Sequence, residues 1–96
     1  MANFRSDSLD RLISAILTLK NKEECYAFFE DLCTIRELKD ISQRLDIAVY
    51  LHDGMNYQEV AAKTGVSSTT ISRVKRSLEY GSGGYEIVIE RMELET

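Results

Sequence analysis

Hydroxyl-bearing and cationic side chains gather between residues 67 and 76, where their types and spacing suit the binding of nucleic acid. Serine and threonine hydroxyls and the cations of lysine and arginine bond to DNA phosphates and to base edges in the major groove. In a helix most of these side chains would share one face, opposite an apolar stripe. The alternative interpretation is a solvated polar face on an ordinary helical hairpin. The candidate DNA contacts are Ser67, Ser68, Thr69, Ser72, Arg73, Lys75 and Arg76.

The residues around this face have the spacing of a helix-turn-helix. Asn56 can cap a first helix, and Glu59, three residues later, can complete a capping box. Gly65 can end that helix in the left-handed conformation, which costs glycine little. Ser67 is a good cap for a second helix. The apolar stripe of this second helix would consist of Ile71, Val74 and Leu78.

Charge is distributed unevenly along the 96 residues, whose formal net charge is −4. Residues 60 to 78 contain four basic residues and no acidic one, so this segment carries +4. The segments before and after it each carry −4. A basic patch on an acidic body attracts phosphates to one face and repels them elsewhere, which orients a protein on a duplex. The partner that these charges favour is double-stranded DNA.

The first half of the chain predicts three helices, the third of which is apolar on two sides. Apolar residues recur at helical spacing within residues 9–17 and again within residues 25–33. Thr34 and Glu37 can form another capping box, which opens a helix that runs to about Asp53. A helix that is apolar on two sides must be covered on two sides. In so short a chain a second subunit is a natural cover, so we expect an intertwined homodimer; the alternative is a monomer whose own helices wrap the third.

A glycine-rich segment, residues 81–84, separates the second helix of the motif from the end of the chain. It lacks the lysine and hydroxyl residue that a phosphate-binding loop needs, so we interpret it as a hinge. Apolar residues at helical spacing follow it and favour a last helix, although alternation near residue 88 also allows a short strand. We therefore expect one domain, with a dimerisation core in residues 1–54, the helix-turn-helix in 55–80, and the hinge and last helix in 81–96.

Composition indicates a compact helical protein and excludes several other classes. The chain is 44% hydrophobic, with five glycines and no proline. No apolar run approaches the ~20 residues of a membrane span, and residues 9–19 are too polar for a signal peptide, so we expect a cytoplasmic protein with no membrane partner. Cys25, Cys33 and His52 are too few for a four-ligand zinc site, and we expect no metal and no cofactor. No catalytic set is supported by spacing, so we expect no enzyme activity.

Three stretches, taken in order, resemble the tryptophan repressor superfamily and, within it, the YerC/YecD-type branch. They are the predicted N-terminal helices, the segment 54–59 followed by 69–73, and the segment 78–85. The resemblance covers nearly the whole chain. It implies an all-helical, interlocked dimer in which each subunit presents one helix-turn-helix to one half of a palindromic operator.

The resemblance also implies a pocket for a small-molecule effector. The family's pocket falls on Thr34, Arg44, Arg73 and Ser77, and the two arginines match the pair that sandwiches the indole ring of tryptophan. The chain departs from the pattern at Val74, where the repressor has a glycine. The isopropyl group would narrow the pocket, since volume added to a packed site is poorly tolerated; alternatively, Val74 is simply a core residue. Both interpretations argue against tryptophan and leave the effector unknown.

These features predict an all-α, tryptophan-repressor-like dimer that binds specific DNA and regulates transcription, as a repressor, without responding to tryptophan. The alternative is a dimeric ligand-sensing or protein-interaction module that keeps the fold and lacks specific DNA binding. The salt dependence of binding distinguishes the regulator from this module, because counterion release makes DNA affinity fall steeply with salt concentration.

Overall fold

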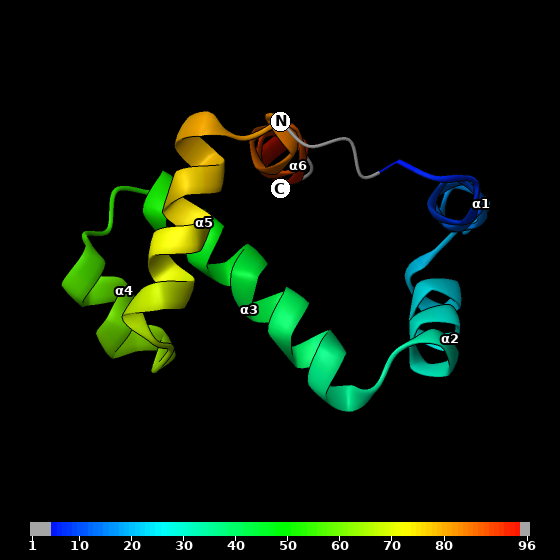
Figure 1. The fold of residues 1–96 in the computed structure, drawn as a ribbon, viewed down its shortest axis with the longest axis horizontal. Coiled ribbons are helices and arrows are strands. Elements are labelled where there is room, and N and C mark those ends of the chain that lie inside the picture. The colour runs from blue at the N-terminus through cyan, green and yellow to red at the C-terminus, as the bar shows by residue number, and fades with distance from the viewer. Residues whose placement is uncertain (1–4, 95–96) are drawn as a thin grey trace. The chain divides into compact units, whose positions relative to one another are not determined.

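The computed structural model describes residues 5–94, and all regular structure in that part of the chain is helical. The all-α prediction is confirmed (Figure 1). None of the described helices is long and apolar enough to cross a membrane. The helices are α1 (Asp7–Ile16), α2 (Lys22–Leu32), α3 (Ile35–His52), α4 (Tyr57–Thr64), α5 (Ser68–Tyr80) and α6 (Gly84–Leu94).

The chain divides into two compact units, and the division falls inside α3. The first unit ends at Leu38 and the second begins at Lys39. The first turn of α3 therefore belongs with α1 and α2, whereas the rest of α3 belongs with α4, α5 and α6.

The first unit consists of capped amphipathic helices that bury little. The Ser6 side chain accepts a hydrogen bond from the backbone N–H of Leu9, and that of Asn21 accepts one from Glu24, so both helices begin at a polar cap. Neither α1 nor α2 contains a fully buried residue. Leu17 is 79% exposed and Ile35, at the start of α3, is 86% exposed. This unit has apolar side chains without a core of their own to cover them.

Helix α3 begins with the predicted capping box. The Glu37 backbone N–H donates to the Thr34 hydroxyl at 3.1 Å, and the Thr34 backbone N–H donates to the Glu37 carboxylate at 2.8 Å. The Thr34 backbone N–H that donates to the carboxylate, and after it the Thr34 side chain, favour the ionised form and lower the pKa of Glu37 below its usual range. Thr34 thus has a structural role at the start of α3.

This capping box predicts a weak acid sensitivity of the first turn of α3. Because the pKa of Glu37 is lowered in the folded state, its contribution to stability is present above the unfolded-state pKa and is lost as pH falls through the folded value. An NMR titration of the side-chain carboxyl carbon of Glu37 should give a pKa below the usual range for a glutamate side chain. Thr34→Ala removes only the side-chain contribution and keeps the backbone N–H, the larger cause, so the Glu37 pKa should rise only part of the way back. A wild-type Glu37 that titrates in the usual glutamate range would contradict the assignment.

The core of the second unit is formed by four helices together. Apolar side chains of α3, α4, α5 and α6 pack into one cluster, and α4 packs against α5 (Figure 1). The predicted stripe of α5 is confirmed, with two members fully buried and Leu78 half-buried. Burial of this cluster supplies the main hydrophobic stabilisation of the unit. Its buried members are Ile47 and Ala48 from α3, Val60 from α4, Ile71 and Val74 from α5, and Ile89 from α6.

The helix-turn-helix has the local structure that its sequence predicts. The capping box of Asn56 and Glu59 is present at the start of α4, and Gly65 ends that helix with φ +70°. Ser67 caps α5 by accepting a hydrogen bond from the Thr70 backbone N–H. The segment after Gly81–Gly84 is a helix, α6, so the helical interpretation of the C-terminal segment is confirmed.

Gly81 ends α5 for a steric reason. A Cβ atom added at this position would lie 2.3 Å from the Ser77 carbonyl oxygen, far inside van der Waals contact. The Gly81 backbone N–H donates to that same oxygen at 2.9 Å, which draws the two residues together. A glycine is therefore required where the last turn of α5 closes.

Candidate nucleic-acid interface

Helix α5 presents its polar side chains on the face opposite the core. Thr69, Ser72 and Arg73 are exposed, as are the two cations further along the helix, Lys75 and Arg76. Within the described residues no carboxylate lies within ion-pair distance of these three cations. Their charges remain available to an anionic partner.

Ser67 and Ser68, the other two candidate contacts, lie at the start of α5 and have backbone roles there. The Ser67 hydroxyl is the N-cap, and it also lies 3.2 Å from the Thr70 hydroxyl. The Ser68 carbonyl oxygen accepts a hydrogen bond from the Tyr57 hydroxyl. The first turn of α5 is thus held from both sides, by its own cap and by α4.

Tyr57, the first residue of α4, connects the two helices of the motif. Its hydroxyl oxygen also lies 2.8 Å from the Ser72 hydroxyl oxygen, one turn further along α5. The side chain is half-buried, because it packs against the core cluster. Tyr57 therefore fixes α5 relative to α4 at the exposed side of the motif.

Two open grooves run along the exposed side of α5. Ser72, Arg76 and Tyr80 line both of them. The first groove, of about 610 Å³, adds Tyr57, Lys75 and Glu79, and the second, of about 440 Å³, adds Thr69, Arg73, Ser77 and Gly81. Cations and hydroxyls predominate, which is the chemistry that binds a sugar-phosphate backbone.

A smaller and more enclosed cavity of about 280 Å³ lies between α3 and α5. It brings together Arg44 and Arg73, the two arginines that the resemblance places in an effector pocket. All of its lining residues are polar or charged. Ser77 lines one of the open grooves instead, and Thr34 belongs to the first unit. The lining consists of Asp40, Gln43 and Arg44 from α3 and Thr69, Thr70 and Arg73 from α5.

Val74 lies in the core of the second unit. Its side chain is 1% exposed and belongs to the cluster that joins α3, α4, α5 and α6. The adjacent Arg73 lines the cavity beside α3 and one of the open grooves, whereas Val74 lines neither. Arg73 thus lies on the exposed face of α5 and Val74 on the buried face.

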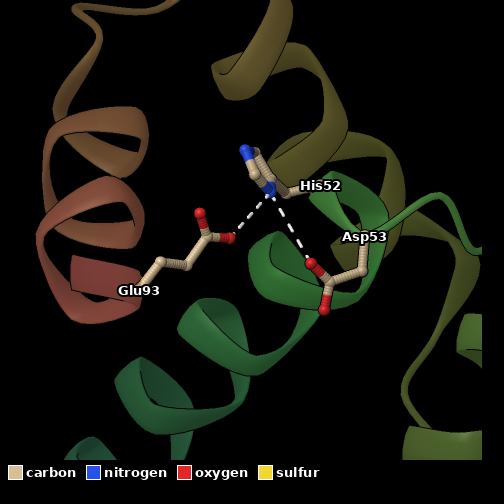
Figure 2. Close-up of side chains that lie close together, drawn as sticks. All are labelled: His52, Asp53 and Glu93. Carbon is tan, nitrogen blue, oxygen red and sulfur yellow. Dashed lines mark ion pairs between the residues drawn. The ribbon is translucent and has the colours of Figure 1, made fainter. Parts of the chain in front are cut away.

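Three potential metal ligands converge elsewhere in the second unit. Asp53 and Glu93 each place a carboxylate oxygen 3.7 Å from His52 Nδ1, between the end of α3 and α6 (Figure 2). All three donor atoms lie within 4.8 Å of one another, and all three residues are exposed. A protonated His52 would join α6 to the end of α3 by ion pairs. Sequence patterns could not reveal this cluster, since Glu93 is distant from the other two residues along the chain.

Sequence reasoning also missed Tyr57, Asp40 and Gln43 as members of the site. Asp40 lies one turn before Arg44 on α3, so a helical projection centred on Arg44 would have found it. Gln43 precedes Arg44 directly in the sequence, and adjacent residues of a helix do not share a face, so a projection would not have found Gln43. No comparable signal exists for Tyr57. Its partners lie 11 and 15 residues away and come within reach only when α4 packs against α5.

Comparisons with known proteins agree with this architecture. Residues 7–93 match the family described as Trp repressor protein. The chain is 50% identical over 89 residues to the uncharacterized protein YerC of Bacillus subtilis (strain 168), covering 93% of this chain and 86% of YerC. The crystal structure of a proposed Trp repressor from Staphylococcus aureus aligns with a TM-score of 0.88 at 49% identity, covering 96% of this chain and 92% of that one. A TrpR-like protein from Eubacterium eligens aligns with a TM-score of 0.87 at 47% identity, covering 93% and 92% of the two chains. Because the family match spans residues 7–93 and YerC is 50% identical over 93% of the chain, this chain belongs to the Trp repressor protein family.

Proposed function

We propose that the protein is a cytoplasmic, homodimeric transcriptional repressor that reads a palindromic DNA operator with α5. The observation that carries the proposal is the exposed face of α5, where three cations without carboxylate partners among the described residues alternate with hydroxyls. The basic segment is flanked by acidic ones, so the same charge pattern directs this face toward phosphates. The proposed role is regulatory, with no enzymatic step.

Exposed apolar surface supports the dimer. Helices α1 and α2 have no buried residue, and Ile13, Leu17 and Leu32 are each about half exposed or more. On α3, Ile41 is 43% exposed although it lies in the middle of a long helix. Apolar side chains of this size favour burial by about 1.5 to 3 kcal/mol each. A second copy of the chain, paired through α1, α2 and α3, would cover them.

We further propose an effector that is small, polar and anionic rather than aromatic. The cavity beside Arg44 and Arg73 has no apolar lining residue that could replace the water around an indole ring. Two guanidinium groups favour a carboxylate or a phosphate, and Asp40 favours an additional donor on the ligand. Tryptophan should therefore leave both the melting temperature and the DNA affinity unchanged.

The test of DNA reading begins with selection of bound duplexes from a random pool. Titration of the selected duplex against salt should then give a steep decline in affinity, with a slope that counts the phosphates neutralised. A protein-interaction module, the second candidate, would bind its partner with far less dependence on salt. Failure to enrich any sequence, with a shallow salt dependence, would favour that second candidate.

Arginine variants should separate positioning contacts from base reading. Arg76 lines both grooves, so Arg76→Ala should weaken all duplexes alike and reduce the salt slope by about 0.9, the value for one phosphate. Arg73→Ala should also relax preference at one position if that side chain reaches a base. Arg91→Ala, on α6 outside the basic face, is the matched control and should change neither slope nor preference. Unchanged binding in both α5 variants would contradict the assignment.

A further inference from the structure

The hydrogen bonds of Tyr57 determine which way the Ser72 hydroxyl proton points. A tyrosine hydroxyl has a single proton to donate, and a backbone carbonyl oxygen can only accept. The proton of Tyr57 is therefore donated to the Ser68 carbonyl oxygen. The second contact, 2.8 Å between the Tyr57 and Ser72 hydroxyl oxygens, must then be donated by Ser72.

Because the Ser72 hydroxyl donates its proton to Tyr57, Ser72 can accept a hydrogen bond from DNA but cannot donate one to it. A free serine hydroxyl both donates and accepts, so it can bind a phosphate oxygen, a base acceptor or a base donor. Once its proton is directed to Tyr57, the exposed side of the Ser72 oxygen offers lone pairs only. It would then repel phosphate oxygens and the N7 and O6 acceptors of guanine.

We propose that Ser72 reads an exocyclic amino group, adenine N6 or cytosine N4, and that Tyr57 is the positioning residue that makes it an acceptor. These two amino groups are the hydrogen-bond donors of the major groove. Arg73 and Arg76, which follow Ser72 on α5, can only donate, so one acceptor beside them distinguishes an amino group from the oxygens around it. The inference rests on the proposed function, because it concerns a duplex lying against α5.

Two features make Tyr57 suitable for this role. Its ring packs against the core cluster, so its hydroxyl has little freedom to follow the rotation of Ser72. Its hydroxyl also donates to the carbonyl oxygen of Ser68 in the first turn of α5, a backbone acceptor that does not depend on a side-chain rotamer. Removing only the hydroxyl should leave the packing of the ring and free the Ser72 proton.

The experiment compares base preference in the wild-type protein, Tyr57→Phe and Ser72→Ala, using duplexes selected by the wild type. At one position per half-site the wild type should prefer adenine or cytosine roughly three- to tenfold, the discrimination expected of a single hydrogen bond. Tyr57→Phe should lose that preference and gain affinity for duplexes with guanine or thymine there. Ser72→Ala should lose the preference without the gain. Tyr85→Phe removes a hydroxyl from another half-buried tyrosine packed on the same core, and its preference should match the wild type.

A measurement on the free protein supplies the structural half of the test. The three-bond couplings of the Ser72 Cβ protons should indicate one fixed rotamer in the wild type and averaging in Tyr57→Phe, with circular dichroism unchanged. Specific DNA binding by the wild type with the same base preference in Tyr57→Phe would overturn this inference alone. Absence of specific binding by the wild type would overturn the proposed function, and this inference with it.

Discussion

Val74→Gly should lower the free energy of unfolding by about 3 kcal/mol, through two separate effects. Glycine in a helix interior costs about 1 kcal/mol relative to alanine, and removing the buried isopropyl group leaves a cavity that costs roughly 2 kcal/mol or more. Val74 is 1% exposed inside the cluster that joins four helices, so the structure has little room to relax around the loss. For a chain of this size the melting temperature should fall by roughly 12 to 24 °C.

Val74→Ala is the matched variant, because it creates nearly the same cavity and keeps a good helix former. The difference in unfolding free energy between Val74→Gly and Val74→Ala measures the cost of glycine in a helix alone. Thermal unfolding followed by circular dichroism gives both free energies. Tryptophan at millimolar concentration should not raise the melting temperature of the wild-type protein. A substantial rise would mean that the cavity beside Arg44 and Arg73 accepts an indole despite its polar lining.

Leu45→Lys should unfold the chain instead of yielding a stable monomer. Leu45 is half-buried on α3 within its own chain, one turn after the exposed Ile41 that the proposed dimer covers. An unpaired charge buried in an interface costs about 3 to 5 kcal/mol. A chain whose first unit has no buried residue in α1 or α2 has little stability to lose.

Sedimentation and circular dichroism test this prediction together. The wild type should sediment at about twice the 11.0 kDa chain mass at micromolar concentration. Ser42→Lys, which adds the same charge at an exposed position of α3, should stay folded and dimeric. A helical, well-folded wild-type monomer would refute the dimer. A folded and dimeric Leu45→Lys variant would show that the interface lies elsewhere, and a soluble, folded Leu45→Lys monomer would show that the chain does not need its partner to fold.

The sequence predicted local structure well, because its signals act within one helical turn. Thr34, Asn56 and Ser67 were each placed as caps from their residue type and their spacing to the following residues, and each is a cap. Gly65 was predicted as a left-handed stop on the same grounds. Such contacts require nothing from the rest of the fold, so a short window contains all the information they need.

The arrangement of the candidate site could be predicted only in part. Helical spacing placed Ser72, Arg73 and Arg76 on the exposed face of α5, and the resemblance paired Arg73 with Arg44. Neither helical spacing nor the resemblance could show that Tyr57 reaches Ser72, or that carboxylates from two segments converge on His52. Both depend on the packing of distant helices, and no periodicity within one helix carries that information.

Substitutions at Gly81 should affect mixed dimers as well as the mutated chain itself. Any side chain at this position collides with the Ser77 carbonyl oxygen, so the last turn of α5 must open to admit it. On the proposed dimer such a chain would still pair with a wild-type subunit through α1, α2 and α3, while its recognition helix was frayed. A mixed dimer would then present one intact and one frayed α5 to the two halves of a palindromic operator. Substitutions at Gly81 should therefore behave as dominant-negative alleles, although the residue has no side chain with which to contact DNA.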